Sequence, residues 1–429
     1  MTDLARKLAD QGHTRAAAAL FLQQFRADPH DFTALVNYAH AAANHDRPAV
    51  IAVIAEYLVE HAADPVALSK GLALQLPYLE SEARRTRGLN EYSAGDVDEP
   101  PFQFSQGTVA RWIEACEARL VVDDNRFAAY SALAWVDHAL RDYAAADDNL
   151  AKARDYPGDP RISAAHFTGP WFDDIERAIS DNMKPAATLK AASVRTARRV
   201  YVGCDEKYFN EYGVILARSL AGQDLCAHFH VYDMAEPNAV MDRLYSLFRM
   251  NFALTTERTS FTDIEQAKHY YASARLIRMA QQMEMDNIPT VMLDADLMLG
   301  GSLGRLFERL DNADIILCRM PGRIPFHTQF NASVVGINPR GGRRYLKRVA
   351  GFIAKSYLDR RVPWCLDQIA LLCTLREMQS RGQGPRSAAC GPFVYDGSMS
   401  PKTALWPQKL TVDNPEHGLC EKARSGFSA

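Results

Sequence analysis

The stretch NIPTVMLDADLMLGGSLGRLF, residues 287–307, contains a short apolar run, then two aspartates, then a cluster of glycines. The run 291–293 has the composition of a buried strand, and it leads directly into Asp294 and Asp296. Because side chains alternate along a strand, we expect both carboxylates on one side of the chain. Two hard oxygen ligands at a strand end can hold Mg²⁺ or Mn²⁺ and leave other coordination positions to substrate phosphates and water. The stretch therefore predicts a divalent metal site.

A D-x-D pattern alone is weak evidence, because the chain contains a second copy at Asp96 and Asp98. That copy lies in a polar stretch with no apolar run before it. The alternative interpretation of Asp294 and Asp296 is a pair of aspartates that cap a turn. The preceding strand is what favours the metal site.

Apolar runs and amphipathic helical patterns alternate through the second half of the chain. The runs are 199–203, 226–232, 251–255, 290–294, 314–318 and 332–338, and the helix candidates between them are 209–221, 237–248, 262–285 and 302–310. Alternating strands and helices predict an α/β domain with a mostly parallel sheet. Ligands of such sheets bind at the carboxyl ends of the strands, where Asp294 and Asp296 lie.

The first 180 residues or so predict helices, because Ala, Leu, Arg and Glu dominate and apolar residues recur at helical spacing. Asp28-Pro29 recurs 36 residues later as Asp64-Pro65, and Asp159-Pro160 follows Asp123 by the same interval. Such a period with acidic-proline turns resembles tetratricopeptide-like (TPR-like) helical repeats. The alternative is an ordinary α-helical bundle.

Two stretches rich in loop-forming residues interrupt these patterns, at 85–104 and 180–198. We therefore predict a helical domain at 1–180, a linker at 181–198 and an α/β domain at 199–429.

The charge balance bounds the partners of the protein. A formal net charge of −3 argues against a general nucleic-acid binder, which needs a basic surplus. From Arg319 to Arg361, ten Lys or Arg residues accompany one acid, Asp359. This stretch is expected to face phosphates or an anionic acceptor, or else to be a solvated helix face.

The sequence also bears on localisation. Its first 20 residues carry acidic residues and no sustained apolar core, which argues against a signal peptide, and no segment has the roughly 20 apolar residues of a membrane span. The eight cysteines form no C-x-x-C pair. This pattern predicts neither a zinc ribbon nor a disulfide framework, and favours a reducing cytoplasm.

The block VYVGCDEKYFNEYGVILARSL, residues 200–220, completes a family resemblance. From about Arg199 onward the chain resembles the GT-A-fold glycosyltransferases of family 8, which include glycogenin and bacterial lipopolysaccharide galactosyl- and glucosyltransferases. The resemblance implies that Asp205 accepts a hydrogen bond from the nucleotide base, that Tyr208 stacks on the base, and that the strand end at Cys204 supplies backbone polar groups. The alternative is a helix-capping Asp205 with a core tyrosine.

Three further blocks follow in the family's order. In HYYASARLIRMAQQM, residues 269–283, Arg275 lies at the edge of an apolar stripe and, by resemblance, contacts the donor; otherwise it is a solvated charge. In QFNASVVGIN, residues 329–338, Asn331 would bind a sugar hydroxyl, with Ala332 and Ser333 where the family commonly has small residues. In WCLDQ, residues 364–368, Asp367 would bind donor-sugar hydroxyls and Gln368 would lie near the anomeric carbon; the alternative for Asp367 is a helix cap.

The last block departs from the family. The family has a histidine metal ligand followed by glycine and lysine, and here the candidates are His417, Gly418 and Lys422 at compressed spacing. His417 is thus the candidate third metal ligand, and a loop histidine is the alternative.

Together these blocks predict a glycosyltransferase that uses Mn²⁺ or Mg²⁺ and a nucleotide-diphospho-sugar. The resemblance implies a UDP-sugar donor and transfer to an acceptor hydroxyl with retention. The acceptor would be a glycan, a lipid-linked molecule or a protein recruited by the helical domain, and the protein would be a possible homo-oligomer. One alternative is a TPR scaffold with an inactive transferase domain. Another is a nucleotidyltransferase, but VGCDEKYF has one glycine where that class has a glycine-rich loop.

Overall fold

The computed structural model of the chain describes residues 2–43, 45–61, 64, 67, 70–71, 74–75, 78, 110, 113–114, 116–117, 120, 126–173, 175–178, 186–191, 197–259, 261, 263–299, 302–319, 326–390 and 405–407. The chain separates into two compact units. Unit 1 comprises Met1–Glu91, Pro100–Gly158 and Pro321–Ile324, and unit 2 comprises Tyr92–Glu99, Asp159–Met320 and Pro325–Ala429. Within the described helices, none combines the length and apolar character needed to cross a membrane.

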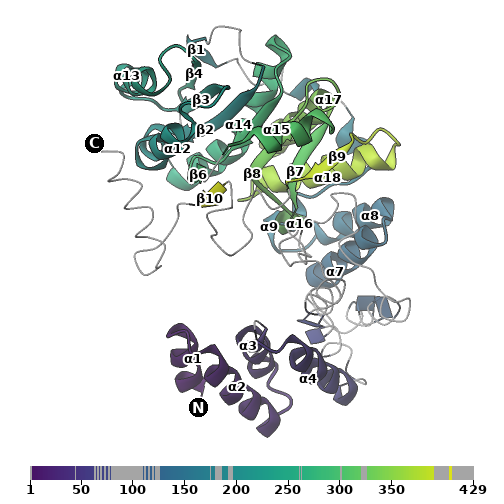
Figure 1. Ribbon diagram of the computed structural model, residues 1–429. Helices are drawn as coiled ribbons and strands as arrows, with labels where there is room; N and C mark the ends of the chain where they lie inside the picture. The colour runs from purple at the N-terminus through teal and green to yellow at the C-terminus, as the bar shows by residue number, and fades with distance from the viewer. Residues whose placement is uncertain are drawn as a thin grey trace. The chain divides into compact units, whose positions relative to one another are not determined.

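Unit 1 is helical, as predicted. Where the structure describes it, its helices include α1 (Thr2–Asp10), α2 (Thr14–Ala27), α3 (Phe32–Ala42), α4 (Arg47–Glu60), α7 (Arg126–Ala139) and α8 (Tyr143–Ala153), shown in purple to blue in Figure 1. The Asp28-Pro29 turn separates α2 from α3, and the Asp31 carboxylate caps α3 by accepting from Ala34 N at 2.9 Å. The assignment to TPR-like repeats remains a prediction, and the stretch with Asp96 and Asp98 lies outside the described residues.

Unit 2 is built on an eight-stranded mixed sheet in the order β1-β4-β3-β2-β5-β8-β7-β9. The strands are β1 (Ala187–Lys190), β2 (Arg199–Asp205), β3 (Cys226–Tyr232), β4 (Phe252–Glu257), β5 (Thr290–Leu293), β7 (Ile315–Arg319), β8 (Phe330–Ile337) and β9 (Ser387–Ala389). All six predicted apolar runs are strands, and the predicted fold class, a helical region followed by an α/β sheet domain, is confirmed.

Two strands run against the others. β8 is antiparallel to both of its neighbours, β5 and β7, and β1 is antiparallel to β4. The first residues of β8 therefore lie at the edge where its neighbours end. β1 lies within residues 181–198, the predicted linker, and ATLK is too short for its pattern to stand out in the sequence.

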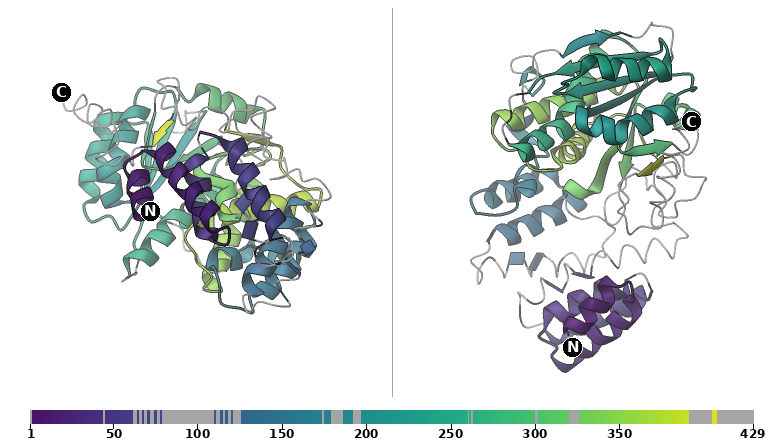
Figure 2. Two further views of the ribbon diagram at one scale, coloured as in Figure 1. Left: turned by 90° about the horizontal axis from the view of Figure 1, so that it is seen from below. Right: turned by 90° about the vertical axis from the view of Figure 1, so that its left-hand side faces the viewer.

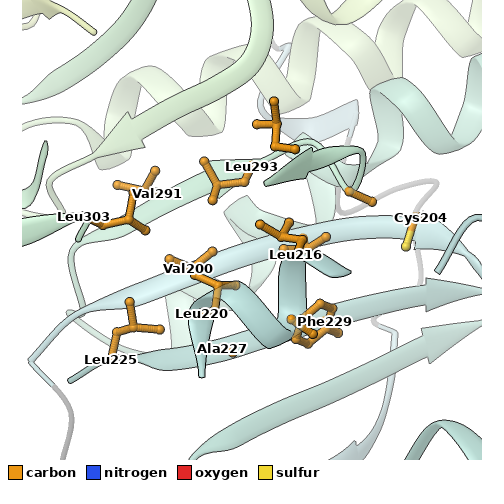
Figure 3. Packing of buried hydrophobic residues seen from close by; sticks show 14 of the residues in the cluster. Val200, Cys204, Leu216, Leu220, Leu225, Ala227, Phe229, Val291, Leu293 and Leu303 are labelled. Atoms are coloured by element: carbon orange, nitrogen blue, oxygen red, sulfur yellow. The ribbon is translucent and has the colours of Figure 1, made fainter. Parts of the chain in front are cut away.

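Helices cover both faces of the sheet (Figures 1 and 2). One layer contains α12 (Val214–Leu220), α13 (Pro237–Phe248) and α15 (Gly304–Asp311), whose apolar residues share a core with the sheet. Figure 3 shows part of this core, including Val200, Leu216 and Leu293, all fully buried. The opposite layer contains α14 (Ile264–Met285), α17 (Arg343–Leu358) and α18 (Leu366–Ser380), which pack on one another and on β2 and β8. A two-stranded sheet pairs β6 (Leu297–Leu299) with β10 (Leu405–Pro407).

Residues just after Gly158 pack with the sheet domain. They form α9 (Pro160–Ser163) and the short helix η1 (Gly169–Phe172), within the predicted helical region 1–180. The His166 and Trp171 rings stack with centroids 4.0 Å apart, and Lys355 of α17 donates to Trp171 O at 2.8 Å. The predicted domain boundaries remain predictions.

The basic stretch is largely engaged in packing. Arg343 donates to Asp286 O at 2.9 Å, and Arg348 pairs with Glu377 at 2.8 Å. Together with the Lys355 contact, these bonds stabilise the α17 layer. They favour neither of the two roles expected for this stretch.

Candidate functional site

The two aspartates of the D-x-D pattern lie in a turn. β5 ends at Leu293, and Leu297 N donates to Asp294 O at 3.2 Å, which closes a turn before β6. The expectation that strand alternation aligns the carboxylates is therefore wrong; the turn positions them. Asp294 N donates to Ser333 O at 2.9 Å, which fixes the turn to β8.

A buried arginine links two of the predicted site residues. Arg275 of α14 contacts the Asp294 carboxylate through one guanidinium nitrogen, and its other terminal nitrogen lies 3.0 Å from Asp367 Oδ2. The same nitrogen donates to Ala332 O at 3.3 Å. One side chain thus joins the D-x-D turn, the start of β8 and the start of α18.

Arg275, which the sequence placed at the edge of an apolar stripe, is buried and is not a solvated charge. It is only 7% exposed, because α14 is covered by the sheet on one side and by α17 and α18 on another. A Cβ atom at Gly203 would lie 2.6 Å from Arg275 Cβ, so glycine in β2 permits the close approach of α14. Although burial opposes the charge, Asp294 and Asp367 raise the pKa of Arg275, and it remains a cation.

Asp367 lies beside Arg275 at the start of a helix. It is in the first turn of α18, and its Oδ1 accepts from Gln368 N at 2.9 Å, but the N-cap of the helix is Cys365, which makes no side-chain cap. Its Oδ2 binds Arg275. Burial and the nearby Asp294 raise the pKa of Asp367, while Arg275 opposes that change. The residue before the helix, Cys365, has a positive φ of 70°, a conformation that is uncommon outside glycine.

A second hydrogen-bonded chain connects Asp205 to Asp296. Asp205 Oδ1 accepts from Tyr208 N at 2.7 Å and caps a short helix, which is the alternative given for this residue. The Tyr208 hydroxyl donates to Asp296 Oδ2 at 2.7 Å. Tyr208 is partly buried rather than a core residue. Burial and the Asp296 carboxylate raise the pKa of Tyr208, so its hydroxyl keeps its proton.

Cys204, Asn331 and Gln368 also lie near this edge. The Cys204 side chain is 4% exposed and belongs to the core, where burial raises the pKa of its thiol. A contact from Cys204 to a ligand would therefore come from its backbone. Asn331 Oδ1 accepts from Ser333 N at 2.8 Å, which shapes the start of β8. The Gln368 side-chain amide lies against the carbonyl oxygens of His327 and Phe330, at 2.5 and 2.7 Å, and the orientation that satisfies both has its nitrogen facing them.

The electrostatics of the edge are unbalanced. Asp205, Asp294, Asp296 and Asp367 lie in the two linked chains of contacts, and the guanidinium of Arg275 neutralises part of their charge. The two chains lie within electrostatic range of each other, since Asp294 adds to the effect of Asp296 on the Tyr208 pKa. A surplus of negative charge favours binding of a cation.

The donor set fits Mn²⁺ or Mg²⁺. These ions commonly take one or two carboxylates and complete their coordination with substrate phosphates and water, which matches Asp294 and Asp296. Within the described ranges, no group of three or more His, Cys, Asp or Glu side chains is placed to hold a metal ion. His417, the candidate third ligand, lies outside the described residues.

Sequence reasoning missed several supporting groups. The carbonyl oxygens of Ala332 and Ser333 bind Arg275 and the Asp294 amide, and those of His327 and Phe330 face the Gln368 side-chain amide. Backbone carbonyls carry no residue-type pattern. The pairing of β8 with β5 was therefore needed to find them.

Comparisons with known proteins give partial matches. No protein-family model and no curated protein matches the chain. Among solved structures, it is similar to mouse xyloside xylosyltransferase 1 in its apo form, with 14% identity and a TM-score of 0.30, over 43% of this chain and 82% of that one. It is also similar to the glycosyltransferase GlyE of Streptococcus pneumoniae TIGR4, with 18% identity and a TM-score of 0.31 over 46% of this chain and 45% of that one. For the apo form of GlyE, the identity is 19% and the TM-score 0.30, over 45% of this chain and 45% of that one. The chain thus spans less than half the length of GlyE.

Proposed function

We propose that this protein is a metal-dependent glycosyltransferase that moves a sugar from a nucleotide-diphospho-sugar to an acceptor hydroxyl. The observation that carries the proposal is a pair of contact chains at the carboxyl edge of the sheet: Arg275 joins Asp294 to Asp367, and Tyr208 joins Asp296 to Asp205. Such an edge is where α/β domains bind nucleotides. By the family resemblance, the donor is a UDP-sugar and the anomeric configuration is retained.

The metal would be held by Asp294 and Asp296. When bound, Mn²⁺ or Mg²⁺ offsets negative charge on the departing nucleoside diphosphate. Interactions of this kind lower the barrier only in so far as they strengthen while the leaving charge develops.

The nucleotide base is assigned to the end of β2. Asp205 would accept a base N–H, the Tyr208 ring would cover the base, and backbone groups at Cys204 would complete the pocket. The support for this assignment is that Tyr208 is partly exposed and bonded at both its amide and its hydroxyl, so its ring is held in one orientation.

The donor sugar is assigned to Asp367, Asn331 and Gln368, with Arg275 between the sugar and the D-x-D turn. Asp367 is bound by Arg275 and by the Gln368 amide, so its orientation is set before any ligand arrives. Transfer breaks the bond from the anomeric carbon to the phosphate oxygen, which keeps the electron pair, and forms a bond to the acceptor oxygen, whose proton leaves.

The acceptor is proposed only as a class. A glycan, a lipid-linked molecule or a protein each fits an acceptor hydroxyl, and unit 1 is proposed as a surface that recruits it. A cytoplasmic location and a homo-oligomeric state remain proposals of the same kind.

The decisive experiment measures thermal unfolding of the full chain with UDP, with and without Mn²⁺. We expect UDP to stabilise the protein only weakly without the metal and by about 2.7 kcal/mol with it at a hundredfold excess over Kd. Asp294→Asn combined with Asp296→Asn should abolish the metal-linked part. Asp96→Asn combined with Asp98→Asn alters the second D-x-D of the chain and is the matched control.

Hydrolysis of a panel of sugar nucleotides then identifies the donor, since slow hydrolysis requires no acceptor. If the unaltered chain shows neither Mn²⁺-linked stabilisation by UDP nor hydrolysis of any sugar nucleotide, the proposal is wrong. That result would leave the scaffold interpretation in its place.

A further inference from the structure

We propose that Tyr208 is a positioning residue that orients Asp296 for the metal, and thereby couples binding of the nucleotide base to binding of the metal. This inference rests on the proposed function, because it assigns a second task to a residue of the same site. The base-stacking role comes from the ring of Tyr208, whereas the new role comes from its hydroxyl.

The hydroxyl joins two parts of the chain that are distant in sequence. Tyr208 ends the short helix α11 (Glu206–Tyr208) after β2, and Asp296 lies 88 residues later in the turn after β5. Their bond is 2.7 Å long, and Asp296 is 9% exposed. Tyr208 thus connects the predicted base pocket to the predicted metal ligand.

The other end of Tyr208 is fixed as well. Its amide is held by Asp205 at 2.7 Å, and its ring packs against Tyr212 with centroids 4.7 Å apart. The residues after it, Phe209–Gly213, form a π-helical turn, in which Phe209 is fully buried. π-Helical turns recur at functional sites. Because the backbone and ring of Tyr208 are fixed, its hydroxyl can hold Asp296 in one orientation.

A hydrogen-bond partner outside the coordination shell orients a metal ligand, and removing that partner lowers metal affinity. Loss of such a partner typically weakens metal affinity by about 10- to 100-fold. A base stacked on the ring and a metal on Asp296 would also share one side chain. Each ligand should therefore strengthen the binding of the other, and the two effects must be equal.

The test uses Tyr208→Phe in the full chain, because phenylalanine keeps the ring and removes the hydroxyl. Mn²⁺ affinity is measured from the electron paramagnetic resonance signal of the free ion, with and without uridine. Uridine has no phosphate, so it cannot bind the metal through a diphosphate. We expect uridine to tighten Mn²⁺ binding several-fold in the unaltered chain, and Tyr208→Phe to abolish this coupling and weaken Mn²⁺ binding by about 10- to 100-fold. Uridine affinity without metal should be unchanged.

The matched control is Tyr270→Phe. Tyr270 also donates its hydroxyl to a carboxylate, Glu257 Oε1 at 2.6 Å, but that carboxylate lies outside the D-x-D turn. We expect Tyr270→Phe to lower thermal stability and to leave Mn²⁺ affinity and the uridine coupling intact. A double variant, Tyr208→Phe with Asp296→Asn, should bind Mn²⁺ no more weakly than Asp296→Asn alone.

The outcomes separate the two proposals. If the unaltered chain binds Mn²⁺ with UDP and Tyr208→Phe binds it equally well, or if the double variant shows additive losses, the positioning role is wrong and the proposed function stands. If the unaltered chain binds no Mn²⁺ even with UDP, the proposed function fails and this inference fails with it.

Discussion

Two arginines on the same helix, three residues apart, serve two differently built regions of unit 2. Arg278 contacts the Glu257 carboxylate and donates to Gln281 at 2.8 Å. Arg275 contacts Asp294 and Asp367. Both arginines are 7% exposed, so burial does not distinguish them.

Their partners do distinguish them. Glu257 pairs with one guanidinium, also accepts the Tyr270 hydroxyl at 2.6 Å, and has a side chain 11% exposed. Asp294 shares its guanidinium with a second carboxylate, and its side chain is 29% exposed. Removing one partner of a charge-balanced, covered pair destabilises the fold, whereas an excess of carboxylates that reaches solvent is an arrangement typical of ligand sites.

The largest effect is expected from Asp294→Asn. Its amide oxygen can still accept from Arg275, so we expect the free energy of unfolding to change by less than about 1 kcal/mol. Donor hydrolysis should fall by about 10³-fold, or about 4 kcal/mol, because the leaving charge loses its stabilisation. Single-turnover hydrolysis and urea unfolding measure the two quantities. If Asp294→Asn lowered the free energy of unfolding by about 4 kcal/mol and left donor hydrolysis intact, the distinction between the two regions would be wrong.

The next effect is expected from Arg278→Leu. This change leaves Glu257 buried without its guanidinium and should lower the free energy of unfolding by about 3 kcal/mol or more. Affinity for UDP and Mn²⁺ should be retained in the folded protein. Urea unfolding and calorimetric titration test this, and a variant of normal stability with lost UDP affinity would contradict it.

The stability contributed by Glu257 should depend on pH. Although burial opposes it, the Arg278 guanidinium and the His230 ring, whose Nε2 lies 3.6 Å from Glu257 Oε2, lower the pKa of Glu257 from 4.5 to about 2. A lowered folded-state pKa contributes stability that is complete above about pH 4.5 and is lost as the pH falls towards about 2. The contribution is about 3 kcal/mol. We expect the stability difference between the unaltered chain and Glu257→Gln to be largest at pH 7 and to shrink steadily below pH 4.5. A difference independent of pH would contradict the ion pair.

The smallest effect is expected from Gly203→Ala, which acts on the position of Arg275. The added methyl group would lie 2.6 Å from Arg275 Cβ, so α14 must shift, at a cost of about 2 kcal/mol. Donor hydrolysis should fall as well, because Arg275 connects Asp294 to Asp367. The control is Gly304→Ala, whose methyl group would meet Ser302 Oγ at 3.3 Å at the start of a helix. Equal effects of the two changes would show that Arg275 tolerates displacement.

Much of the fold followed from local pattern. The run 226–232 and the helix 237–248 were predicted with the bounds that the structure gives to β3 and α13. Asp294 and Asp296 follow their strand, as predicted, but they lie in a turn, so strand alternation does not position their carboxylates. The burial of Arg275 could not be predicted, since its surroundings come from three separate elements.

The sequence by itself determined six strands of the large sheet, four of the helices between them and the candidate residues for a metal and nucleotide site, because periodicity and residue type are local properties of a chain. Tertiary structure alone decided that β8 runs antiparallel to its neighbours, that Arg275 bridges Asp294 and Asp367, and that Tyr208 binds Asp296. Asp367 and Asp296 lie 92 and 88 residues from their partners. Contacts across such separations depend on how sheet and helices pack, which no short stretch of sequence specifies.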